Sequence, residues 1–150
     1  MKKVCRYVFI IAGVFLLIGV LFGIGIYRNG QRMINNRYGY IVVYDGGIYY
    51  YANGKIFYYK DKKIKVVENA KTPYFKLSKE GTKPQIVYLD EMSTSIFHPP
   101  IDLPSDDSYT RIAWDDENVY ARYPGGSSYI VVYKIVNNRK ELKKIDIIHC

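Results

Sequence analysis

The hydrophobic pattern of the chain changes near residue 40. Residues 8–27 contain no charged side chain, and Tyr27 is the only one of them with a strongly polar group. A helix of this length spans roughly 30 Å, the thickness of the hydrocarbon core of a bilayer. The segment also lacks the polar face that a helix on a soluble domain would show. The pattern therefore predicts a transmembrane helix over residues 8–27.

A cleaved signal peptide is the main alternative to a permanent anchor. Signal peptides have a shorter apolar region, of about 7 to 15 residues, and a small-residue cleavage site. Here the apolar run ends in GIGIYRNGQR without an A-x-A pattern. Cys5 precedes the run, whereas a lipoprotein would need a cysteine just after it. We therefore expect an uncleaved signal anchor, with membrane lipid as a partner.

Basic and acidic residues are distributed unevenly along the chain. Six of the 22 basic residues flank the apolar run, and all 14 acidic residues lie from Asp45 onward. The domain after residue 39 is thus nearly neutral. The net charge of +8 comes mainly from the residues beside the apolar run, which favours contact with anionic lipid headgroups over nucleic acid. The predicted parts are a basic leader (1–7), the transmembrane helix (8–27), a juxtamembrane linker (28–39) and a β domain (40–150).

The orientation in the membrane depends on the flanking charges. Three basic residues lie on each side of the helix, so the positive-inside rule is tied. The amino-side charges lie closer to the helix, and a short leader before a long domain is typical of a signal anchor. We expect the amino end in the cytoplasm and the β domain outside it.

One face of the predicted helix carries small residues. Gly19 and Gly23 form a G-x-x-x-G pair, and Ala12 falls on the same face seven residues earlier. Small residues let two membrane helices approach closely, so this face is a candidate for a homodimer. Glycine is also common in membrane helices without any such role.

From Tyr40 onward the pattern alternates with the period of two that is typical of β-strands. Asn53-Gly54 predicts a two-residue type I′ hairpin turn, because both residues tolerate a positive φ. This turn places Tyr51 opposite Ile56 and Tyr49 opposite Tyr58. Extending the register predicts a core face with these residues: Val42, Tyr44, Ile48, Tyr50, Phe57, Tyr59, Ile64 and Val66.

The second half of the chain repeats this pattern less regularly. Strand-like runs at QIVYLD, TRIAWD, NVYARY, SYIVVYKIV and ELKKIDIIH are separated by turns and by a proline-rich loop near residues 94–108. Two stretches share an aromatic strand, a glycine turn and a second aromatic strand: IYYYANGKIFYYKDKKI and VYARYPGGSSYIVVYKI. They resemble the blades of some bacterial β-propellers. Roughly 110 residues cannot close four blades of about 40 residues each. The predicted fold is a single transmembrane helix followed by an all-β domain, an antiparallel meander or small sandwich of about eight strands.

Candidate catalytic and metal sites are few. The sequence has no H-E-x-x-H, G-x-S-x-G, P-loop or EF-hand motif, so no enzyme activity and no cofactor are predicted. His149 and Cys150 offer only two adjacent ligands, fewer than a metal site needs. The acidic residues near the long loop are read as solvated charges rather than a calcium site; they are Asp102, Asp106 and Asp107.

Tyrosine is the most distinctive feature of the predicted domain. The chain has 17 tyrosines, more than a core of this size requires. The face opposite the predicted core includes Tyr49, Tyr51, Tyr58 and Lys65, which form a candidate binding patch for a protein or a carbohydrate. The alternative is that this face packs against a second sheet.

These features favour a membrane-anchored interaction module of the cell envelope, of the type of an immunity or inhibitor protein. This hypothesis rests on general architecture. The alternative is a small envelope hydrolase that acts on cell wall or glycan. That hypothesis requires two carboxyl groups, such as Asp90, Asp102 or Asp115, to converge in one cleft.

Overall fold

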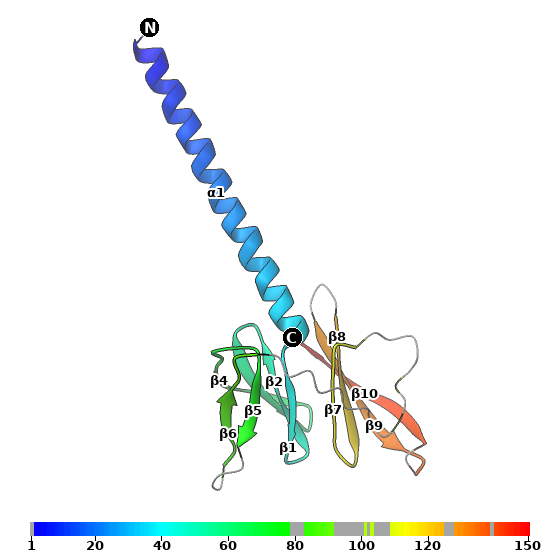
Figure 1. The fold of residues 1–150 in the computed structure, drawn as a ribbon. Coiled ribbons are helices and arrows are strands. Elements are labelled where there is room, and N and C mark those ends of the chain that lie inside the picture. The colour runs from blue at the N-terminus through cyan, green and yellow to red at the C-terminus, as the bar shows by residue number, and fades with distance from the viewer. Residues whose placement is uncertain are drawn as a thin grey trace. The chain divides into compact units, whose positions relative to one another are not determined.

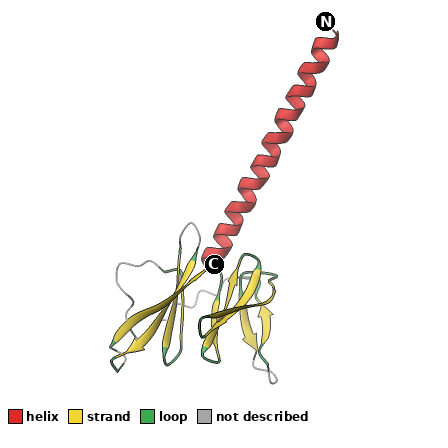
Figure 2. Cartoon of the chain, turned by 180° about the vertical axis from the view of Figure 1, so that it is seen from behind, coloured by secondary structure: helices red, strands yellow, loops and turns green. Residues whose placement is uncertain are grey.

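A computed structural model describes residues 2–78, 83–91, 101, 103, 109–124, 128–138 and 140–150 of the chain. Its elements are one long helix followed by strands (Figures 1 and 2). The chain divides into two units, residues 1–32 and residues 33–150. This arrangement confirms the predicted class, an apolar N-terminal helix followed by an all-β domain.

Helix α1 extends from Lys2 to Tyr38. Its residues Ile11–Gly30 are long and apolar enough to cross a membrane, and their side chains are exposed. The predicted linker, residues 28–39, is helical up to Tyr38. This segment contains no proline and only two glycines, so nothing in it breaks the helix before Gly39, a residue type that commonly follows a helix end.

The first sheet is an antiparallel meander in the order β1-β2-β3-β4. Its strands are β1 (Ile41–Tyr44), β2 (Gly47–Ala52), β3 (Lys55–Lys60) and β4 (Lys63–Asn69). Asn53 and Gly54 have φ values of 51° and 77°, as a type I′ turn requires. The predicted pairs Tyr51–Ile56 and Tyr49–Tyr58 are both confirmed.

The second sheet has the order β10-β9-β8-β7. Its strands are β7 (Arg111–Trp114), β8 (Asn118–Tyr123), β9 (Tyr129–Val136) and β10 (Glu141–His149). A separate hairpin pairs β5 (Phe75–Ser78) with β6 (Gln85–Tyr88). The described residues thus form ten strands, more than the eight or so predicted, partly because the short segment FKLS gave no clear strand signal.

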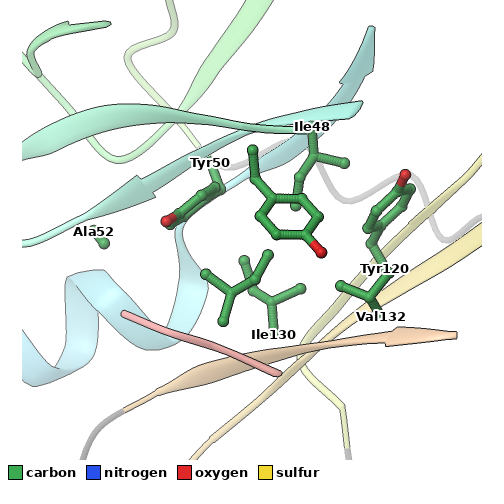
Figure 3. Close-up of a cluster of buried hydrophobic side chains, with 8 residues drawn as sticks. Ile48, Tyr50, Ala52, Tyr120, Ile130 and Val132 are labelled. Atoms are coloured by element: carbon green, nitrogen blue, oxygen red, sulfur yellow. The ribbon is translucent and has the colours of Figure 1, made fainter. Parts of the chain in front are cut away.

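The main core lies between the two four-stranded sheets. Figure 3 shows Ile48 and Tyr50 from the first sheet directed toward Ile130 and Val132 from the second. The cluster also contains Ala52, Tyr59, Tyr120 and Ile148. Together these side chains remove a continuous apolar surface from water, which is the main stabilising contribution to such a domain.

The predicted core face is correct for β2 and β3 and wrong for β1. The turn at Asp45-Gly46 has two residues, so Val43 lies opposite Ile48. Ile41 and Val43 therefore pack on the main core, whereas Val42 packs with Tyr49 on the other face. A shift of one residue exchanges the two faces of a strand.

The predicted face is also only partly buried in β4. Ile64 and Val66 do lie opposite Tyr59 and Phe57, as expected. Their side chains are nevertheless 53% and 49% exposed, because β4 is the edge strand of its sheet.

A buried arginine connects the two sheets. Arg122 of β8 is 0% exposed. Its Nη1 atom donates a hydrogen bond to the carbonyl oxygen of Gly39 at 2.8 Å, and its Nη2 atom donates one to the carbonyl oxygen of Tyr51 at 2.6 Å. Arg122 thus ties the second sheet to β2 and to the residue that follows α1.

Gly39 leaves the space that this contact needs. A Cβ atom at position 39 would lie 2.8 Å from Nη1 of Arg122 and 2.9 Å from Cδ1 of Tyr51. We expect Gly39→Ala to lower the free energy of unfolding by about 1–3 kcal/mol, because a buried side chain has to move. Urea unfolding of the full chain in detergent, followed by the fluorescence of Trp114, measures this loss.

Gly30→Ala is the matched control, since a Cβ there meets nothing within 4 Å. It should leave the unfolding midpoint of the β domain unchanged. A Gly39→Ala midpoint equal to that of the control would contradict the role of Gly39.

Candidate functional site

The predicted aromatic patch lies on the first sheet, on the face that points away from the main core. Tyr49 and Tyr58 are opposite each other on β2 and β3, and their ring centroids are 4.7 Å apart. Lys65 of β4 is opposite Tyr58, and Tyr44 of β1 contacts Tyr49 at 6.1 Å. The register therefore brings together three of the four predicted residues and adds Tyr44.

Tyr51 does not belong to the open surface. It is only 7% exposed and packs with Ile56 of β3 and Phe75 of β5. The β5–β6 hairpin contributes Leu77, Ile86 and Tyr88 to this second cluster. The alternative considered above, packing against another sheet, is therefore the outcome at Tyr51, while Tyr49 and Tyr58 stay half-buried.

The open part of this face is held in place by its own contacts. We call it the tyrosine–lysine surface and define it by five residues: Tyr44, Tyr49, Tyr58, Lys60 and Lys65. The Tyr58 hydroxyl donates a hydrogen bond to the carbonyl oxygen of Tyr44 at 3.3 Å. Lys60 forms an ion pair with Asp45 at 3.0 Å. These contacts connect the end of β3 to the end of β1 and to the turn that follows it, so they restrict the side chains.

Gly47 provides room for the Tyr58 side chain. A Cβ atom at position 47 would lie 3.0 Å from the Tyr58 hydroxyl and would collide with the carbonyl oxygen of Tyr59. Burial raises the pKa of Tyr58 above its ordinary value of 10.0. The hydroxyl is therefore neutral near pH 7 and can donate a hydrogen bond.

The predicted dimer face lies on α1. Ala12, Gly19 and Gly23 are exposed, and a Cβ added at either glycine meets nothing within 4 Å in the chain. The face is therefore open to another helix. Pairing of two chains through it stays a prediction.

The carboxyl groups of the hydrolase hypothesis do not form a cleft among the described residues. Asp115 accepts hydrogen bonds from the backbone N–H groups of Glu117 and Asn118, each at 2.8 Å, and so closes its own turn. Asp90 is exposed beyond the end of β6. Asp102 lies outside the described residues, as do Asp106 and Asp107 of the calcium hypothesis.

Metal ligands do not converge in the part of the chain that the structure describes. There, no three side chains of the His, Cys, Asp or Glu type are grouped as a metal site requires. His149 is exposed, whereas Cys150 is half-buried and its backbone N–H donates to Ser128.

Comparisons with known proteins give no relative for this chain. No family model, no curated protein and no solved structure matches it.

Tyr88 holds the hairpin beside the tyrosine–lysine surface. Its hydroxyl donates to Oε1 of Glu68 on β4 at 2.5 Å. Burial and then this hydrogen bond raise the pKa of Tyr88 to about 12 from 10.0. Because the folded pKa is the higher one, the stabilisation is complete below pH 10 and is lost as the pH rises toward 12.

We therefore expect the stability difference between the wild type and Tyr88→Phe to disappear between pH 10 and 12. Below pH 10 the variant should be less stable by about 1 kcal/mol or less, since the bond is partly exposed to water. Urea unfolding of both proteins from pH 8 to 12 gives this difference. A difference that stays constant with pH would show that the hydroxyl does not interact with Glu68.

Proposed function

We propose that this chain is a single-pass membrane protein whose β domain binds a protein partner in the cell envelope. The tyrosine–lysine surface is the observation that supports this function. It places three tyrosine rings and two lysines on one open face of the first sheet. Tyrosine is enriched where proteins bind one another, because a ring offers a large contact area and a polar tip.

The arrangement of these rings favours binding over a purely structural role. Tyr49 and Tyr58 already contact each other, and Tyr58 is fixed by its hydrogen bond to β1. Little side-chain freedom is then lost when a partner covers them, which lowers the entropic cost of association. Preorganised aromatic side chains are typical of the residues that dominate binding energy.

The charges of the surface indicate the chemistry of the partner. Lys65 is exposed beside Tyr58, and exposed Lys63 lies opposite Lys60 in the register of β3 and β4. Asp45 pairs with Lys60 and neutralises part of this charge. The partner should therefore present apolar or aromatic groups surrounded by carboxylates, since complementary charge guides association.

The membrane part of the proposal depends on α1. Its apolar, exposed residues Ile11–Gly30 have the length of a membrane span, and arginines follow them. We propose that they anchor the chain, with the β domain outside the cytoplasm. An anchored binding domain that contacts proteins at the membrane is consistent with an immunity or inhibitor role.

The hydrolase alternative gains no specific support from the described residues. A glycosidase requires an acid and a second carboxylate on opposite sides of a scissile bond. Asp115 instead accepts two backbone hydrogen bonds within its turn. Binding is therefore the function that we favour.

Anchoring is tested by extraction of cell membranes. We expect the full chain to stay in the membrane pellet at alkaline pH in carbonate, because its apolar helix is embedded in lipid. Protease added to cells with a permeable outer layer should remove the β domain if it lies outside the cytoplasm. Release into the carbonate supernatant, or a mature chain that begins after Tyr27, would contradict the anchor.

Binding is tested with a photo-crosslinking amino acid in place of Lys65 in intact cells. We expect one protein adduct, which Tyr49→Ala should reduce at least tenfold because a central ring is removed. A crosslinker in place of Lys143, an exposed lysine of the second sheet, is the matched control. Equal adducts from both positions, or no effect of Tyr49→Ala in a folded domain, would contradict the proposed surface.

A further inference from the structure

Two arginines lie side by side on neighbouring strands of the second sheet. Arg111 of β7 and Arg122 of β8 are direct partners in the antiparallel register. Directly opposed residues have Cβ atoms about 5 Å apart, and like charges at such positions repel each other. The pair also lies on the side of the sheet that faces the main core, since Arg122 bonds to carbonyl groups of Gly39 and Tyr51.

Three nitrogen donors of this pair are buried without a hydrogen-bond partner. They are Nε of Arg122 and both Nε and Nη2 of Arg111. The two Arg111 atoms form one edge of its guanidinium, the edge that binds two oxygens of an anion side by side. A buried donor without a partner costs about 1–3 kcal/mol, so these groups favour an acceptor.

The neighbours of the pair do not supply negative charge. Tyr40 offers the face of its ring, 4.9 Å from the Arg111 Cζ atom. The Cys150 thiol lies within hydrogen-bonding reach of the Arg122 guanidinium, but burial raises the pKa of the thiol, which is therefore neutral at pH 7. Among the described residues, no carboxylate lies within ion-pair distance of either arginine.

We propose that Arg111 and Arg122 form a binding site for a phosphate-type oxyanion. Two positive charges and three free donors match a doubly charged anion with several oxygens. Arg111 as a whole is half-buried, whereas its free Nε and Nη2 atoms are buried, so an anion reaches them only after the side chain or its cover shifts. The anion would offset the repulsion between the two guanidinium groups. Its source is either a lipid phosphate headgroup or inorganic phosphate.

This site is separate from the tyrosine–lysine surface. The arginines belong to the second sheet and face the main core, whereas the tyrosines lie on the outer side of the first sheet. A failed anion test would therefore leave the proposed binding function intact. Likewise, loss of partner binding would not argue against the anion site.

The test is the thermal unfolding of the full chain in nanodiscs made of an uncharged glycolipid without phosphate. Unfolding is followed by the fluorescence of Trp114, three residues after Arg111. We expect 20 mM inorganic phosphate, or phosphatidic acid in the disc, to raise the midpoint by about 4 °C or more over chloride of equal ionic strength. A rise with only one of them identifies the source, and a rise with neither overturns the proposal.

Arg111→Gln separates an anion site from a structural arginine. Without phosphate or phosphatidic acid, we expect this variant to unfold at a higher temperature than the wild type, because the repulsion is removed. With either anion, its midpoint should no longer rise. Lys143→Gln, the same charge change elsewhere on the sheet, should keep the full response.

Arg111→Lys provides a second variant in case glutamine disturbs the packing on Tyr40. Lysine keeps the charge and loses the two-donor edge, so we expect less than half of the wild-type rise. A lower midpoint in both variants combined with an unchanged response to phosphate and phosphatidic acid would show that Arg111 only packs on Tyr40, and would overturn the proposal.

Discussion

The β domain depends on one buried cation. A guanidinium removed from water loses several kcal/mol of hydration, and Arg122 has no described carboxylate to compensate. Its stabilising contacts are two charge-assisted hydrogen bonds to the carbonyl oxygens of Gly39 and Tyr51. These bonds exist only when β8, β2 and the segment after α1 are all in place. The charge therefore favours the native arrangement, since a packing that separated these segments would remove its two acceptors.

Tyrosine side chains throughout the domain combine an apolar ring in the core with a hydroxyl that needs a hydrogen-bond partner. A small sandwich needs large side chains to fill its core, yet the outer ends of those side chains reach water or polar groups. Tyr59 and Tyr120 pack in the main core, and their hydroxyls donate to Asp146 at 2.6 Å and to Asp115 at 3.4 Å. Burial, with the nearby carboxylates, raises the pKa of both tyrosines above 10.0, which keeps them neutral donors. The high tyrosine content is thus largely structural, and the open surface on the first sheet uses what remains.

The sequence predicted the local structure better than the contacts between elements. The Asn53-Gly54 turn defined the register of β2 and β3, because a two-residue turn leaves one pairing. The two-residue turn at Asp45-Gly46 places Ile41 and Val43 on the core face, where the sequence predicted Val42 and Tyr44. Tyr51 was expected on the open surface because β5 had no clear pattern, so its covering hairpin was not foreseen. Arg122 gives a usable signal, because after Asn118 it is the one charged residue among the apolar and aromatic residues of NVYARY. A charge inside a strand that is buried on both faces has to find acceptors, but sequence alone does not say where they lie.

The position of the open surface follows from how the other faces are covered. The outer side of the second sheet packs Val119, Ala121 and Tyr133 with Leu103, a residue of the long connection before β7. One half of the outer side of the first sheet packs against the β5–β6 hairpin. In the other half, Tyr44, Tyr49 and Tyr58 are instead ordered by each other, by a backbone carbonyl and by an ion pair at their border. Rings that served only the core would not need this ordering on their exposed side. The fixed geometry is consistent with a surface that recognises a partner, since preorganised rings lose little freedom on binding.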